Sequence, residues 1–171
     1  MFPNDANDRW CFNAFGSSYV GKATPSYDYK VAAGTTVVAA TAGTVSRVEA
    51  ETNPLYPGEF EIETRVTPNT AFIVIYDHVK NLRVALGSLV EAGTVLGTAG
   101  IHTSNPNVYG RVELQINRVL DFSNRRSEAV CPRTFGTARF NQLNDAALAA
   151  HNSANPSFAS SSVCVSDTVQ P

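Results

Sequence analysis

The chain has 171 residues, of which 43% are hydrophobic and 16% are charged, so it can bury one core and carry an extension. Its 13 Lys and Arg residues against 15 Asp and Glu residues give a formal net charge of -2, which excludes the strongly basic surface typical of nucleic-acid-binding proteins. No run approaches the roughly eighteen apolar residues of a membrane span, and the first residues lack a basic region followed by an apolar one. The sequence as given therefore predicts neither a membrane span nor a signal peptide.

One apolar phrase occurs twice in the chain. Residues 33–43 have the sequence AGTTVVAATAG, and residues 92–100 repeat it in shortened form as AGTVLGTAG. Two copies are too few for a solenoid, which needs three or more stacked units, so we expect a compact duplicated β fold. The glycines of each copy are expected where the chain turns tightly or where another backbone comes close.

Alternation of apolar and polar residues predicts most of the strands. In chain order, the predicted strands are 27–31, 36–40, 44–50, 59–66, 71–76, 82–89 and 108–117. Residues 71–76 are continuously apolar, which places them at the centre of the sheet. In the last strand, one face carries Val112, Leu114 and Ile116, and the other carries Arg111, Glu113 and Gln115.

The composition changes toward Asn, Arg and Ser after residue 122. An apolar spacing over residues 143–150 predicts a short helix, with Asn141 or Asn144 as its cap, and residues 152–162 are expected to form a loop. The fold class expected is an all-β body, residues 1–122, followed by a helical, loop-rich extension, residues 123–171.

The three cysteines are too widely spaced for a zinc ribbon. Cys131 and Cys164 bracket the polar tail, where a disulfide would add most stability, so we expect either a Cys131–Cys164 bridge in an exported, periplasmic or secreted protein, or two reduced and buried thiols. Cys11 lies beside Trp10 and Phe12, in a cluster expected to hold the amino-terminal segment against the body, and is expected to be a small core residue.

Residues 27–45 resemble the opening of the lysostaphin/LytM-type zinc endopeptidases, which cleave peptidoglycan cross-links. Three later segments are similar to that family in the same order: residues 72–78 to its central strand, 90–97 to its V-x-x-G-x-x-x-G hairpin, and 112–116 to its last strand. The resemblance covers roughly residues 14–118. It implies the duplicated barrel-sandwich hybrid fold and a cell-wall context.

The catalytic motifs of that family are incomplete in this sequence. In the family's H-x-x-x-D motif both named residues bind zinc; here Asp28 fills the Asp position, but Thr24 replaces the His. The family's H-x-H on the last strand corresponds to Arg111 and Glu113, and Leu86 replaces the His of its Tyr-x-His. The resemblance therefore implies a degenerate member, with no catalytic residue and no bound metal expected.

Arg111 offers a physical substitute for the missing ion. A catalytic zinc site normally has three protein ligands, mostly imidazoles, and a water whose pKa the metal lowers to about 7. Asp28 and Glu113 supply only two carboxylates, and a guanidinium near both would neutralise them through charge-assisted hydrogen bonds. We therefore predict a metal-free site held together by Arg111.

The three histidines leave one alternative open. His78 follows the central strand at a place where the family also carries a histidine that binds no metal, so a structural role is expected for it. His102 lies in the loop before the last strand, and an irregular zinc site formed by Asp28, His102 and Glu113 is the alternative to a solvated loop histidine. His151 lies in the tail and is expected to be exposed.

Three functions are consistent with these patterns. The first is a non-catalytic LytM-like module that binds peptidoglycan or an envelope protein. Binding would use the cleft that corresponds to the family's active site, together with the loops 53–58 and 102–109. The second is a metallo-endopeptidase with unconventional zinc ligands, and the third is a structural or assembly module of an envelope or virion complex. In the first case, aromatic residues could line the groove for a glycan or peptide, namely Tyr19, Tyr27, Tyr29, Tyr56 and Tyr109.

Overall fold

The computed structural model describes residues 12–19, 21–67, 71–103, 105–124 and 126–170. Its strands are β1 (Phe12–Asn13), β2 (Ser18–Tyr19), β3 (Lys22–Ala23), β4 (Tyr27–Ala32), β5 (Thr36–Val38), β6 (Gly43–Ala50), β7 (Phe60–Val66), β8 (Phe72–Lys80), β9 (Leu89–Val90), β10 (Val95–Ile101), β11 (Tyr109–Asp121), β12 (Arg126–Val130) and β13 (Thr168–Val169). The helical elements are η1 (Pro132–Thr134), α1 (Ala138–Ala154) and η2 (Pro156–Phe158). Within the described ranges, no helix has the length and apolar character needed to cross a membrane.

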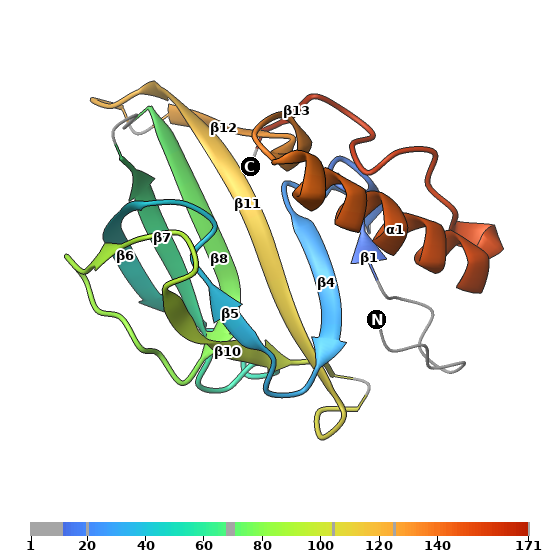
Figure 1. Cartoon of the computed structure of the whole chain (residues 1–171), viewed down its shortest axis with the longest axis horizontal. Coiled ribbons are helices and arrows are strands. Elements are labelled where there is room, and N and C mark those ends of the chain that lie inside the picture. The colour runs from blue at the N-terminus through green and yellow to red at the C-terminus, as the bar shows by residue number, and fades with distance from the viewer. Residues whose placement is uncertain (1–11, 20, 68–70, 104, 125, 171) are drawn as a thin grey trace.

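The longest strand, β11, organises the sheet. Strands β4 and β12 pair with one of its edges, and β10 and β8 pair with the other, all in antiparallel orientation. From β8 the sheet continues through β7 and β6 to β9. Figure 1 shows β11 crossing the sheet diagonally, with β4 on one side and β8 and β7 on the other. The fold is therefore the all-β type that the alternating patterns predicted.

The two copies of the repeated phrase pair with each other. Strand β5 comes from the first copy and β10 from the second, and Thr36 lies opposite Thr98 in an antiparallel ladder. The first glycine of each copy, Gly34 and Gly93, has a φ of 76° and 89° respectively. Residues with a Cβ rarely adopt these left-handed φ values, so glycine is needed at both turns. The tight turns expected at the repeat are confirmed.

Most predicted strands are present, and two regions differ. The strand predicted at 82–89 is wrong, because only Leu89–Val90 pairs with β6. Gly87 has a φ of 83°, and the Ser88 N–H donates to the Ala85 carbonyl oxygen at 3.0 Å, so this segment makes a tight turn instead. Strand β12 was not predicted. It follows the turn that contains the expected 122/123 boundary and pairs with β11 through its backbone, so the tail begins by extending the sheet.

The helix α1 is longer than predicted and begins earlier. Its cap is Thr137, whose Oγ1 accepts a hydrogen bond from the Phe140 N–H at 3.2 Å, so the prediction of Asn141 or Asn144 as cap is wrong. Asn144 lies inside the helix and accepts a 2.7 Å hydrogen bond from the Tyr29 hydroxyl. His151 is also buried by the helix, at 5% exposed, which corrects its expected exposure.

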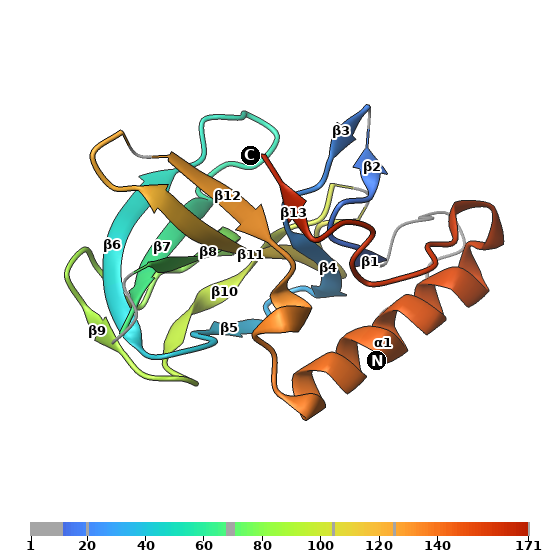
Figure 2. The ribbon, with the colours of Figure 1, turned by 90° about the horizontal axis from the view of Figure 1, so that it is seen from above.

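Two apolar cores hold these elements together. One core fills the interior between the repeat and strands β6, β7 and β8, with Ile62, Val79 and Leu96 fully buried. The other lies between α1 and the β1–β4 edge of the sheet, around Phe12 and Tyr27. Figure 2 shows α1 lying along this edge. The C-terminal extension is therefore packed against the sheet rather than detached from it.

A disulfide joins Cys131 at the end of β12 to Cys164 in the tail, with Cα atoms 6.0 Å apart. Beside it, the Tyr27 hydroxyl lies 3.2 Å from the Cys164 Sγ. The structure thus contains the bridged alternative and not the two reduced thiols. The expectations for Trp10 and Cys11 fall outside the described residues.

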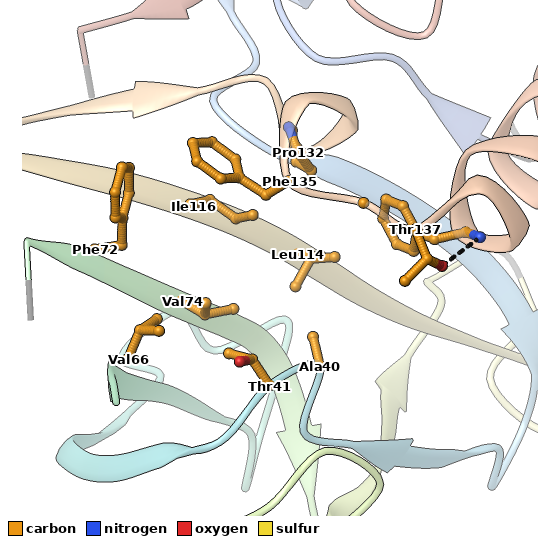
Figure 3. Close-up of a pocket in the computed structure, with 12 residues that line it drawn as sticks. Ala40, Thr41, Val66, Phe72, Val74, Leu114, Ile116, Pro132, Phe135 and Thr137 are labelled. Atoms are coloured by element: carbon orange, nitrogen blue, oxygen red, sulfur yellow. Dashed lines mark hydrogen bonds between the residues drawn. The ribbon is translucent and has the colours of Figure 1, made fainter. Parts of the chain in front are cut away.

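An apolar groove of about 440 Å³ opens where the extension meets the sheet. Val74, Leu114 and Ile116 of the sheet form one wall, and Phe135 and Thr137 stand on the other (Figure 3). Alternation along β11 places Leu114 and Ile116 on the face opposite to Arg111 and Glu113. The groove is therefore separate from the site predicted around Arg111.

Candidate functional site

Strand register brings three carboxylates into one row across the sheet. Glu113 of β11 lies directly opposite Asp28 of β4 and, on its other side, directly opposite Asp77 of β8. Residues that lie opposite each other in antiparallel strands point to the same face. Arg111 lies two residues before Glu113 on β11, so its side chain is on the same face, next to this row. The sheet therefore positions three acids and one permanent cation together.

Arg111 lies between the two carboxylates that the sequence assigned to the degenerate metal position. Its Nε and Nη2 donate to the two oxygens of Asp28 at 3.2 Å and 2.9 Å, and Nη2 also contacts Glu113 Oε1. Its Nη1 donates to the Tyr56 hydroxyl at 3.2 Å. Asp28 is only 2% exposed, so this bidentate pair is shielded from water. The contacts are those expected for a guanidinium that replaces an ion.

The electrostatics of the three groups differ. Burial raises the pKa of Asp28 to about 7; the Glu113 carboxylate adds to this shift and Arg111 opposes it. Burial alone would also raise the pKa of Glu113, but its neighbours, with His78 first among them, lower it. Burial alone would lower the pKa of Arg111, and Asp28 and Glu113 raise it instead. Glu113 is therefore the acid held in the ionised form, beside an arginine that keeps its proton.

His78 stands next to this row in an unusual backbone conformation. Its φ is 59°, a left-handed value that non-glycine residues seldom adopt. Its Nδ1 lies 2.7 Å from Glu59 Oε2, and its Nε2 lies 3.5 Å from Glu113 Oε1 and 3.8 Å from Asp77 Oδ2. Burial alone would lower the pKa of His78, but its bonds to Glu113 and Glu59 raise it to about 9. The histidine expected to be structural therefore belongs to the charged cluster.

Several members of this cluster were not predicted. Glu59 is fully buried although its strand pattern suggested an exposed position, and it also accepts a hydrogen bond from the Ile101 N–H. Ser26 donates a 2.5 Å hydrogen bond to Glu113 Oε2. Asp77 is the one for which the sequence held a signal, because an acid followed by histidine interrupts an otherwise apolar strand.

The remaining degenerate positions, Thr24 and Leu86, carry no metal-binding imidazole. Thr24 exchanges backbone hydrogen bonds with the segment at Gly16 and Ser17. Leu86 lies in the turn before β9 and is 70% exposed. Neither position therefore returns a ligand to the site.

His102 does not join Asp28 and Glu113. It is 7% exposed, and its ring packs edge-on against Tyr109, with ring centres 6.4 Å apart. Tyr109 is four residues from Glu113 along β11, a distance of about 13 Å. The irregular site predicted from Asp28, His102 and Glu113 is not assembled, and the alternative of a solvated loop histidine is wrong because the ring is buried. Within the described part of the chain, the metal-ligating group whose ligand atoms all lie within 4.8 Å is Asp77, His78 and Glu113.

The residues at the family's metal position do not fit zinc. Thr24 supplies no imidazole, and both oxygens of Asp28 are bonded to Arg111. A divalent ion at that point would also meet the permanent charge of the guanidinium.

A polar groove of about 540 Å³ continues from the cluster along the same face. Beyond Glu113 and Asp77, register sets Ile75 opposite Gln115 and Glu63, and then Ile73 opposite Asn117 and Arg65. The groove is lined by Ser46, Arg47, Glu63, Arg65, Ile73, Ile75, Asn117, Val119, Phe122, Arg126 and Ser127. It combines donors and acceptors with apolar surface, which suits an extended peptide.

Only part of the expected aromatic lining lies on this face. Tyr27 and Tyr29 point into the core beside α1, where Tyr27 is stacked on Phe140. Tyr56 does reach the site: its ring lies edge-on to His78, with ring centres 4.7 Å apart. The side chain of Tyr19 is outside the described part.

Comparison with known proteins agrees with the fold. The sequence profile of peptidase family M23 matches residues 22–125. The chain is similar to the catalytic domain of the antimicrobial peptidase lysostaphin from Staphylococcus simulans, with 19% identity, a TM-score of 0.53, and coverage of 74% of this chain and 88% of that domain. A variant of the catalytic domain of the prophage-encoded M23 protein EnpA from Enterococcus faecalis has 20% identity, a TM-score of 0.53 and coverage of 74% and 92%.

Against whole lysostaphin in solution, the identity is 21% and the TM-score 0.55, and the match covers 74% of this chain but 48% of lysostaphin. At these identities the structures show a shared fold and nothing beyond it. A search of curated protein sequences gives no significant match.

Proposed function

Because the chain belongs to peptidase family M23, whose characterised members act on peptidoglycan, we propose that it is a non-catalytic member that binds peptidoglycan without cleaving it. The binding surface is the face that carries Arg111 and the polar groove beyond it. The Cys131–Cys164 disulfide supports an extracytoplasmic location, where cell wall is available.

The pairing of Arg111 with Asp28 carries this proposal. Hydrolysis in this family needs a metal that activates water. Arg111 takes up both oxygens of the one conventional ligand that the sequence keeps, and an arginine with a raised pKa cannot serve as a general base. The face thus keeps the polar lining of a binding site while its catalytic group is replaced.

The groove supports binding of an extended peptide. Arg65 and Glu63 lie on neighbouring rows of the same face, and Asn117 adds an amide in the row of Arg65, across Ile73. Such side chains can bond the amide groups and carboxylates of a cross-linking peptide. Binding by this surface requires no metal.

The test combines sedimentation with purified cell-wall sacculi and release of dye from labelled wall. We expect the protein to sediment with sacculi and to release no dye. The groove variant Glu63→Gln/Arg65→Ala should sediment less, whereas Arg139→Ala, on the exposed side of α1, should behave as wild type.

The other outcomes separate the alternatives. Dye release that a chelator abolishes would overturn the proposal in favour of an active metallo-endopeptidase. If the protein neither sediments with sacculi nor releases dye, the proposal is overturned in favour of binding to an envelope protein or an assembly role.

A further inference from the structure

Asp77 and His78 are neighbours in sequence, yet both side chains reach the same row of groups. Neighbouring residues of a regular strand point to opposite faces. Here the register between β7 and β8 shifts: Phe60 lies opposite Val79 and Ile62 opposite Tyr76. Between these pairs Glu61 faces both Asp77 and His78, which is a β-bulge.

The φ of 59° at His78 completes this redirection. A left-handed conformation at a non-glycine residue is strained and persists where surrounding contacts hold it. The bulge and the strained residue together aim the His78 ring at Glu113, across the strand from Asp77.

The spacing of the three side chains matches a metal triad. His78 Nε2 lies 3.5 Å from Glu113 Oε1 and 3.8 Å from Asp77 Oδ2. Three tetrahedral zinc ligands with bonds of 2.0–2.1 Å lie about 3.4 Å apart. These two distances exceed that value by a few tenths of an ångström or less, and the ligand atoms of all three residues lie within 4.8 Å of one another.

Each ligand is also held by an outer contact of the kind that metal sites use. The Nδ1 of His78 bonds the fully buried Glu59 at 2.7 Å, which leaves Nε2 facing the acids. Ser26 donates to Glu113 Oε2, and the His78 N–H donates to Asp77 Oδ1 at 2.7 Å. The oxygens that face Nε2 are Glu113 Oε1 and Asp77 Oδ2.

We propose that Asp77, His78 and Glu113 form a divalent transition-metal site, displaced across β11 from the family's zinc position and independent of Asp28. One imidazole and two carboxylates suit zinc better than calcium or magnesium, which prefer an all-oxygen shell. Three protein ligands leave a fourth coordination position of a tetrahedral ion for a water or another ligand.

Arg111 and this site coexist. Glu113 Oε1 contacts Arg111 Nη2 and is the atom that must be released to the ion. The bidentate pair with Asp28 remains when that contact is lost, because Nε and Nη2 bond separate oxygens of Asp28. Asp28 thus still neutralises Arg111, while the ion neutralises Glu113.

The test titrates Zn²⁺ alone into the metal-stripped full chain by calorimetry, and repeats the titration with Co²⁺, whose visible absorption reports ligand type and geometry. Wild type should bind one ion per chain with a low-symmetry cobalt spectrum. His78→Asn and Asp77→Asn should each weaken binding at least tenfold, and Glu59→Gln should weaken it about 10–100-fold. Both variants should fold, because Asn tolerates the left-handed φ at position 78 and has nearly the same shape as the Asp that it replaces at position 77. Circular dichroism checks that they do.

Asp145→Asn, which alters an exposed acid of α1 outside the cluster, is the control and should bind within threefold of wild type. No binding by wild type, or binding that Asp28→Asn abolishes and Asp77→Asn retains, would overturn the site. Zinc-dependent release of dye from labelled wall would refute the proposed non-catalytic function but would leave the metal site standing. Sedimentation with sacculi tests the proposed function and does not depend on the metal site.

Discussion

Replacement of Arg111 by methionine tests the pairing at the centre of the site. Methionine keeps most of the side-chain stem but removes the guanidinium, so Asp28, at 2% exposed, loses its counterion and faces Glu113 alone. Breaking a buried pair by removing one partner costs about 3–5 kcal/mol of unfolding free energy. We expect a loss in this range at neutral pH, measured by urea denaturation.

Arg118→Met is the matched control, because it removes an arginine from the same strand. Arg118 pairs with Glu128, but its side chain is 50% exposed. A surface pair of this kind contributes less than about 1 kcal/mol. Equal losses in the two variants would refute the claim that Arg111 neutralises a buried carboxylate.

The pH dependence of the Arg111→Met loss has a definite sign. The pKa of folded Asp28 is raised to about 7, above its ordinary value of 3.8, so its contribution to stability is complete below that ordinary value and is lost as the pH rises through 7. Removing Arg111 removes the group that opposes this shift. The loss should therefore shrink on going from neutral to acid pH, and a loss that grows in acid would contradict the assignment.

Three further predictions concern other parts of the molecule. The double variant Cys131→Ala/Cys164→Ala opens a loop of 33 residues and should lower the unfolding free energy by about 3–4 kcal/mol, as measured by urea denaturation; an unchanged value would contradict a stabilising bridge. Burial raises the pKa of Tyr27 from 10.0 to about 12, so the unfolding free energy should fall as pH rises between these values. Tyr27→Phe should reduce that fall in alkaline denaturation curves, and an unaltered curve would contradict the raised pKa of Tyr27. The triple variant Thr24→His/Arg111→His/Glu113→His restores the family's ligand pattern around Asp28 and should retain zinc after dialysis, as measured by elemental analysis; a version that also carries Asp28→Ala should retain less, and equal retention would argue against this register.

Much of the sheet could be predicted from alternation alone. The pattern in β11 correctly separated Arg111 and Glu113 from the apolar face, because side chains on a regular strand alternate without regard to tertiary contacts. The pattern failed at residues 82–89, where an apolar run ends in a Gly87 turn. It also failed at β12, a short polar segment that pairs through its backbone rather than through an apolar face.

The candidate site shows the same limit more sharply. The proximity of Asp28, Arg111 and Glu113 could be predicted because the family resemblance aligns these positions with one metal site, and each of them lies on a regular strand. The role of His78 was not, because its direction depends on a bulge and a left-handed φ that periodicity does not encode. Glu59 looked like an ordinary solvent-facing residue, and only the folded chain buries it against His78.

The most direct test is a crystal structure of the protein soaked in excess zinc, with anomalous diffraction recorded at the zinc edge. Our account predicts that the Arg111 guanidinium remains within hydrogen-bonding distance of both Asp28 oxygens and that no ion is bound by Asp28. An anomalous peak coordinated by Asp28, with Arg111 turned away from it, would contradict the account.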